Sequence, residues 1–114
     1  FHYLHHDREG RPYSDRCELS LRLLRAAERA GIAITLLPVL YAHSGFGGTA
    51  PTPAQRRFVY DSDAYLRLVS ELHRHTSSTQ QAALVRLGVA PHSLRAVTPS
   101  ELAQVISAIS AIDA

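Results

Sequence analysis

The stretch IAITLLPVLY, residues 32 to 41, is a nearly continuous apolar run. A strand of a parallel sheet is buried on both faces, so apolar residues occupy successive positions along it rather than alternate ones. The run is followed by the Gly- and Pro-rich residues 43 to 53, which predict a long loop. This part of the sequence therefore predicts a buried parallel strand that ends in a loop.

Helices are predicted on both sides of this strand. Before it, Asp15 and Glu18 have the spacing of a capping box, apolar residues then recur at helical spacing, and Gly31 stands where a C-terminal glycine belongs. After it, a second helix is predicted to be capped near Ser62, and residues 80 to 86 could prolong it. Its predicted apolar face consists of Ala64, Tyr65, Leu68, Val69 and Leu72.

The rest of the chain predicts two short strands and a third helix. The strands are expected at residues 1 to 4 and 87 to 92. Thr98 and Glu101 form a second predicted capping box, and Pro99 takes the first helical position, where its missing N–H costs nothing. The predicted buried face of this helix consists of Leu102, Val105, Ile106 and Ile109.

The predicted order is strand, helix, strand, helix, strand, helix, which indicates an α/β protein with a parallel sheet. Such units occur in doubly wound sheets and in closed (β/α)8 barrels. No G-x-G-x-x-G or Walker loop follows a predicted strand, so dinucleotide and P-loop functions have no supporting motif. The chain begins at Phe1 inside a predicted strand and contains no methionine. We therefore expect three consecutive βα units cut from a TIM-like barrel.

Composition excludes several classes of function. The net charge is only +2, and the arginines do not cluster beyond Arg56 and Arg57, so we expect no nucleic-acid partner. Cys17 is the single cysteine, which rules out a disulfide framework or a Cys-based zinc site and fits a reducing, cytoplasmic compartment. No apolar stretch is long enough to span a bilayer, so we expect no membrane partner.

Polar side chains gather where the predicted strands end. In a (β/α)8 barrel the chemistry lies at the C-terminal ends of the strands. The opposite ends of the predicted strands carry no comparable set of polar residues. We therefore expect this chain to carry part of an active site. The strand-end candidates are Tyr3, His5, His6, Tyr41, His43, the loop of residues 44 to 48, His92, Ser93 and Arg95.

Most of the histidines have simpler interpretations than metal binding. In an extended strand His2 and His6 share one face while His5 points the other way, so we do not expect the three to converge on one metal ion. We expect one or two of them to pack or to form hydrogen bonds at the barrel mouth. His43 is expected to be a solvated loop residue.

The pair His92 and Arg95 is the strongest candidate for binding. Arginine can hold a carboxylate by two parallel hydrogen bonds, and histidine can donate, accept or transfer a proton near neutral pH. The alternative is a structural salt bridge of Arg95, which its place just before a helix N-terminus disfavours because that end of the dipole prefers anions. Tyr3 could be a core aromatic or could offer its hydroxyl to a ligand.

Four segments together resemble the formimidoylglutamate deiminases of the amidohydrolase superfamily: FHYLHHD (1–7), ITLLPVLYAHSGFGG (34–48), QRRF (55–58) and PHSLRAVTP (91–99). Only residues 73 to 84 lack a clear counterpart. The resemblance implies a (β/α)8 barrel with a small β-sandwich, a homodimer and one divalent metal, usually Zn2+. It also implies hydrolysis of N-formimidoyl-L-glutamate to N-formyl-L-glutamate and ammonia, a step of histidine degradation.

The resemblance assigns Tyr3, His92 and Arg95 to substrate binding. Arg95 would hold a carboxylate of the substrate, Tyr3 would add a hydrogen bond, and His92 would contact a polar end. The family's metal ligands lie on the first, fifth and eighth barrel strands, whereas this chain would supply strands 2 to 4. Residues 1 to 114 would then be a partial barrel domain with no catalytic residue and no metal ligand, inactive alone.

Two other functions remain open at this point. One is another amidohydrolase-superfamily deaminase that acts on a neutral ring such as guanine, although such a substrate offers Arg95 no carboxylate. The other is a small non-catalytic binding module in which the histidine cluster takes a metal.

Overall fold

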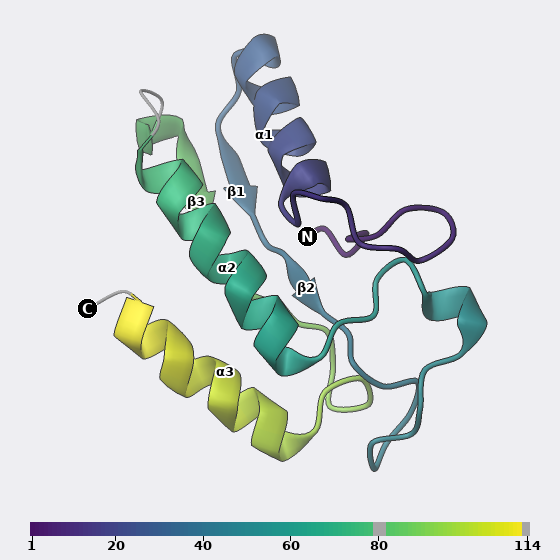
Figure 1. Cartoon of the computed structure of the whole chain (residues 1–114). Helices are drawn as coiled ribbons and strands as arrows, with labels where there is room; N and C mark the ends of the chain where they lie inside the picture. Colours follow the sequence, from purple (N-terminus) through teal and green to yellow (C-terminus); the bar gives the residue numbers. More distant parts are fainter. Residues whose placement is uncertain (79–81, 113–114) are drawn as a thin grey trace.

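The computed structural model describes residues 1–78 and 82–112. Helices and short strands alternate along the chain, and two 3₁₀ turns interrupt the connections (Figure 1). The elements are α1 (Glu18–Ala30), β1 (Ile34–Leu36), β2 (Val39–Leu40), η1 (Pro53–Gln55), α2 (Ser62–Ser77), η2 (Ala82–Leu84), β3 (Val85–Leu87), β4 (Ala90–Pro91) and α3 (Pro99–Ile112).

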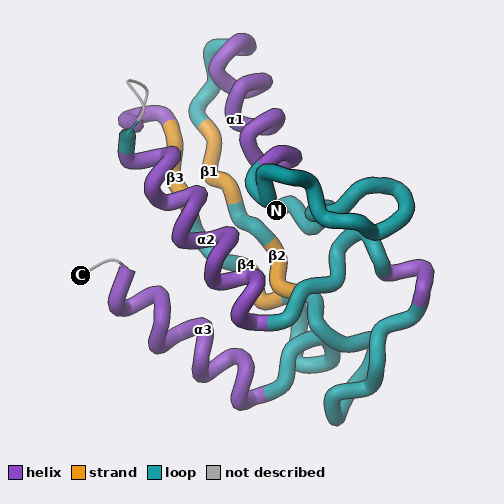
Figure 2. Tube along the Cα trace, viewed as in Figure 1, coloured by secondary structure: helices purple, strands orange, loops and turns teal. Residues whose placement is uncertain are grey.

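The predicted second strand is split into β1 and β2 and the predicted third strand into β3 and β4, and these two lines of strands run side by side (Figure 2). β1 pairs with β3 and β2 pairs with β4, both in parallel. Pro38, which has no N–H to donate, separates β1 from β2, but its carbonyl still accepts the Ala90 N–H at 3.1 Å. Gly88 N donates to Leu36 O at 3.0 Å across the same break. The two lines of strands thus stay together along their whole length.

The N-terminal residues form a third parallel line. His2 bridges Pro38 in parallel, with His2 N donating to Leu37 O and Val39 N donating to His2 O, both at 2.9 Å. The predicted strand at residues 1 to 4 is therefore reduced to a single bridge, but it lies where a neighbouring strand of the same sheet belongs. The parallel α/β architecture predicted from the sequence is confirmed.

The helices run back along the strands, from the C-terminal end of the sheet toward its N-terminal end (Figure 1). α1 lies against β1, and α2 lies against both β3 and α3. One buried cluster joins β2 to α2 and α3, and a second joins α1 and β1 to α2 through Cys17, Leu36 and Leu68. None of the helices within the described ranges is long and apolar enough to cross a membrane.

The predicted capping box at Asp15 is wrong. Asp15 Oδ1 accepts the Cys17 N–H at 2.9 Å and its carbonyl accepts Glu18 N at 3.1 Å, so Asp15 closes a turn that precedes the helix. An aspartate side chain often accepts a hydrogen bond from the backbone N–H two residues ahead. Here the Asp15 carboxylate makes that bond in the turn, before α1 begins at Glu18. Gly31 does end the helix, in the left-handed conformation at φ 71°.

The second helix begins where the sequence indicated. Asp61 is the N-cap, with its carboxylate accepting the Ala64 N–H at 2.7 Å, and Ser62 is the first helical residue. Tyr65, Leu68, Val69 and Leu72 are buried as predicted.

The proposed continuation of this helix over residues 80 to 86 is wrong for the part that the structure describes. Residues 82–84 form a 3₁₀ turn, and Val85 and Arg86 belong to β3 because they pair with Ile34 and Thr35. Residues 80 and 81 lie outside the described ranges.

The third helix has the predicted cap. Thr98 N donates to Glu101 Oε2 at 2.8 Å, and Glu101 N donates to Thr98 Oγ1 at 3.3 Å. Val105 is fully buried, but Ile106 is 57% exposed, so its place on the predicted buried face is wrong. Successive helical residues point about 100° apart, and it is Val105 that faces the buried cluster.

Candidate substrate-binding rim

Tyr3, His92 and Arg95 lie at or just beyond the C-terminal ends of neighbouring parallel strands. His92 follows β4 directly, and its N–H donates to Leu40 O at 3.0 Å, which continues the pairing of β2 and β4. Tyr3 follows the bridge at His2 and is 39% exposed. Because the strands are parallel, their ends share one edge of the sheet, as the sequence predicted.

A continuous row of rings joins Tyr3 to His92. Tyr3 contacts Phe58 edge-to-face at a centroid distance of 5.1 Å, Phe58 contacts Tyr41 at 5.0 Å, and Tyr41 contacts His92 at 4.7 Å. Gln55 Nε2 donates to the Tyr41 hydroxyl at 3.1 Å and steadies the row. These edge-to-face contacts hold Tyr3 and His92 on one aromatic wall although they are far apart in the sequence.

The sequence marks Tyr41 only as a strand-end candidate and does not indicate that Phe58 belongs to this wall. The available signals were the place of Tyr41 at the end of the apolar run and the QRRF segment at residues 55–58.

Arg95 stands on a tight turn whose following residues are buried. Ala96 N and Val97 N both donate to Ser93 O, at 3.1 and 2.9 Å. Ala96 and Val97 are almost fully buried, while Arg95 is exposed. Its guanidinium makes no hydrogen bond or ion pair with residues 1–78 or 82–112. Within those ranges the alternative of a structural salt bridge has no support, and the cation is free to meet an anionic ligand.

The His92 imidazole is oriented by its neighbour in sequence. Its Nδ1 lies 3.1 Å from Ser93 Oγ, and that hydroxyl also accepts the Ala96 N–H at 3.2 Å. A hydroxyl that accepts one hydrogen bond still has its proton to donate. Donation to Nδ1 would leave the ring proton of a neutral imidazole on Nε2, which makes Nε2 the donor toward a ligand.

The N-terminal histidines serve the fold, as predicted. His5 Nε2 donates to Val39 O at 2.9 Å, and His6 Nδ1 donates to Arg56 O at 3.0 Å, since a carbonyl can only accept. Burial lowers the pKa of His5 to about 4, so its ring is neutral near pH 7. His2 Nε2 is buried without a partner in the described part of the chain. The three rings do not converge to form a set of metal ligands.

Another group of potential ligands does not suit a catalytic metal either. Asp15, Cys17 and Glu71 bring one donor atom each within 4.8 Å of one another. Burial, aided by the nearby carboxylates, raises the pKa of the Cys17 thiol to about 12, and metals bind the thiolate. Glu71 is also paired with Arg16 at 3.2 Å. These three residues therefore do not fit a zinc ion.

His43 is not the solvated loop residue that the sequence suggested. Its Nε2 lies 2.8 Å from Oε1 and 3.0 Å from Oε2 of Glu101, and both side chains are only 21% exposed. Burial alone would raise the pKa of Glu101, but hydrogen bonds from Thr98 and His43 outweigh it and hold this pKa below its usual value. The carboxylate is therefore ionised at neutral pH.

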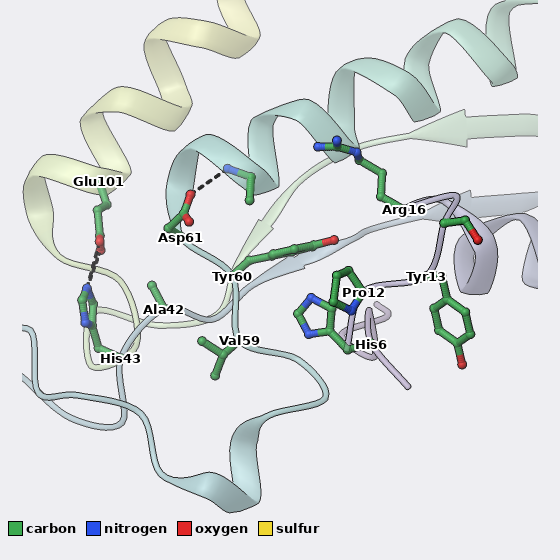
Figure 3. A pocket seen from close by; sticks show the side chains of 12 residues that line it. His6, Pro12, Tyr13, Arg16, Ala42, His43, Val59, Tyr60, Asp61 and Glu101 are labelled. Atoms are coloured by element: carbon green, nitrogen blue, oxygen red, sulfur yellow. Dashed lines mark hydrogen bonds and ion pairs between the residues drawn. The ribbon is translucent and has the colours of Figure 1, made fainter. Parts of the chain in front are cut away.

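The pair of His43 and Glu101 borders a cavity of about 690 Å³ that also reaches His6 and Tyr60 (Figure 3). Figure 3 shows the pair at one end of this cavity and Arg16 at the other, with the cap of α2 at Asp61 between them. Tyr3, His92 and Arg95 do not line this cavity.

Comparison with known proteins identifies the class first. No protein-family model matches the chain. Its structure superposes on a crystal structure of an amidohydrolase from Brucella melitensis with a TM-score of 0.89 and 48% sequence identity, over 96% of this chain and 24% of that one. The α/β fold, with its parallel strands, is thus the fold of a piece of an amidohydrolase and fits part of a TIM-like barrel.

The sequence adds a more specific relative. The chain is 54% identical over 108 residues, 95% of its length, to the formimidoylglutamate deiminase of Pseudomonas aeruginosa. It spans only 23% of the length of that relative. The resemblance to formimidoylglutamate deiminases that the motifs indicated is confirmed.

Proposed function

We propose that residues 1–114 form the substrate-binding part of a zinc-dependent deiminase that hydrolyses N-formimidoyl-L-glutamate to N-formyl-L-glutamate and ammonia in histidine degradation. The observation that carries the proposal is the guanidinium of Arg95, which has no hydrogen-bond or ion-pair partner within residues 1–78 and 82–112. It stands at the strand ends, on the turn that also carries His92, in a chain 54% identical to a formimidoylglutamate deiminase. A substrate built on glutamate brings carboxylates that such a guanidinium binds bidentately.

The three side chains then have separate roles. Arg95 holds a substrate carboxylate. His92 offers its Nε2 to the polar end of the substrate, since Nδ1 is engaged by Ser93. Tyr3 contributes a hydroxyl that makes no hydrogen bond within residues 1–78 and 82–112, while its ring is held against Phe58. The aromatic wall between them fixes the spacing of the rim.

The wider assignment follows the same resemblance. The three parallel lines of this chain would be strands 2 to 4 of a (β/α)8 barrel, and residues 1–114 a partial barrel domain. By the same resemblance, the zinc ligands would lie on other strands of the full-length protein. The full-length enzyme would be a cytoplasmic homodimer without nucleic-acid or membrane partners, and this segment alone would be inactive.

The first test is to read the gene on both sides of this segment and to assay its full-length product. We expect a His-x-His strand upstream, and downstream a strand with one histidine and a later one with an aspartate. The product should release ammonia from N-formimidoyl-L-glutamate and not from guanine. Ammonia released from guanine alone would replace the proposal by a ring deaminase. Stop codons on both sides, with a monomer that melts cooperatively, would point to a binding module.

A further inference from the structure

A sheltered contact joins the loop after β2 to the start of α3. His43 Nε2 faces both carboxylate oxygens of Glu101, at 2.8 and 3.0 Å, across 58 positions of sequence. A pair with only 21% of each side chain exposed is less screened by water than an ordinary surface pair. The contact therefore ties two segments that belong to neighbouring strand ends.

The side chain of Glu101 is held in place independently of His43. The capping box with Thr98 fixes the carboxylate by a 2.8 Å bond from the Thr98 N–H. Ordering a long side chain costs conformational entropy. The helix cap already orders Glu101, so the contact with His43 requires little further ordering of that side chain. His43 consequently meets a fixed partner, which makes the contact suited to setting a position.

Backbone hydrogen bonds next to this contact also join the loop after β2 to the segment between β4 and α3. Ala42 N and His43 N both donate to Ala96 O, at 3.0 and 2.9 Å. Ala96 directly follows Arg95 in the sequence. At the other end of the turn, His92 N is bonded to Leu40 O at 3.0 Å. The turn that carries His92 and Arg95 is thus attached to β2 at its start and to the loop after β2 at its end.

We propose that His43 is a positioning residue for Arg95: together with Glu101 and the Ala96 carbonyl, it holds the turn from which Arg95 reaches the substrate carboxylate. The inference rests on the proposed function and adds to it the residue that positions the Arg95 guanidinium. In this role His43 acts through the turn that carries Arg95 and not by a contact of its own with the substrate. Without its side chain the α3 cap persists, and the turn gains freedom relative to β2.

The test uses steady-state kinetics of the full-length protein with N-formimidoyl-L-glutamate. His43→Ala should raise KM about fivefold or more while kcat changes less than about twofold, because substrate binding is lost without loss of chemistry. His43→Gln, whose amide can donate to Glu101, should recover most of the affinity. Glu101→Asp keeps the negative charge at α3 but withdraws it from His43, and should resemble His43→Ala.

Two comparisons separate positioning from general destabilisation. In an Arg95→Lys background, His43→Ala should raise KM by less than about twofold further, because residues that act through one another are not additive. Asp61→Ala removes a matched helix cap on α2. It should lower thermal stability without raising KM. Additive effects of His43 and Arg95, or an Asp61→Ala variant that raises KM as much as His43→Ala, would overturn the proposal.

Amide hydrogen exchange over residues 92–97 measures the same contact without substrate. His43→Ala should speed exchange there relative to wild type and to Asp61→Ala, and unchanged exchange would overturn the role of His43. If the wild-type protein does not act on N-formimidoyl-L-glutamate, the proposed function fails. The exchange result then still decides whether His43 holds the turn.

Discussion

Replacing Arg95 by lysine is the most direct test of the proposal that Arg95 binds a substrate carboxylate. Arg95 is exposed, and its guanidinium is unpaired within residues 1–78 and 82–112. The substitution therefore breaks no observed contact of the fold, and its effect on stability should be small. Lysine keeps the positive charge but loses the planar fork that gives two parallel hydrogen bonds to a carboxylate.

The size of the effect follows from the bond that is lost. A hydrogen bond to a charged group contributes about 1.5 to 3 kcal/mol. Losing one of two such bonds corresponds to a roughly 10- to 150-fold weaker binding of substrate. If the bond forms equally in the ground state and in the transition state, KM rises by this factor and kcat stays nearly unchanged.

The assay is ammonia release by the full-length protein over a range of N-formimidoyl-L-glutamate concentrations. Arg25→Lys on the exposed face of α1 is the matched control and should leave both constants unchanged. A KM within twofold of wild type for Arg95→Lys would refute the carboxylate contact. A fall in kcat alone would move Arg95 from binding to the chemical step.

Two further predictions concern stability. His5 is buried, and its pKa is lowered from 6.5 to about 4. Between these pH values the unfolded chain therefore binds a proton at His5 that the folded chain does not bind. The contribution of neutral His5 to the free energy of unfolding is therefore fully present above pH 6.5. It is lost as the pH falls toward 4, and the free energy of unfolding decreases by about 3 kcal/mol in all. Urea unfolding of the full-length protein should show this loss, and His5→Gln should flatten it; an equal slope in both would contradict the assignment. Tyr65→Phe should lower the free energy of unfolding by about 1 to 2 kcal/mol, because the buried hydroxyl donates to Pro38 O at 2.8 Å and accepts Ala90 N at 3.3 Å. An unchanged urea midpoint would show that these bonds contribute nothing net.

Some features of this protein could be predicted from the sequence because their causes are local. Gly31 ends α1 through its own left-handed backbone, and the Thr98 cap of α3 is closed by bonds that span three residues. The apolar run from 32 to 41 indicated a buried strand because both of its faces must avoid water. The strand-end rule likewise located Tyr3, His92 and Arg95 at one edge of the sheet.

Other features depended on partners that lie far away in the sequence. Asp15 has the spacing of a cap but closes a turn, and Ile106 is exposed although Val105 beside it is buried. A local sequence pattern shows which residues could form a cap or a buried face. Tertiary packing decides which of them do. The tertiary structure alone showed that Phe58 joins the rings of Tyr3 and Tyr41 and that His43 meets Glu101. Contacts of this kind arise only when parallel strands bring their ends together, and spacing within one segment cannot encode them.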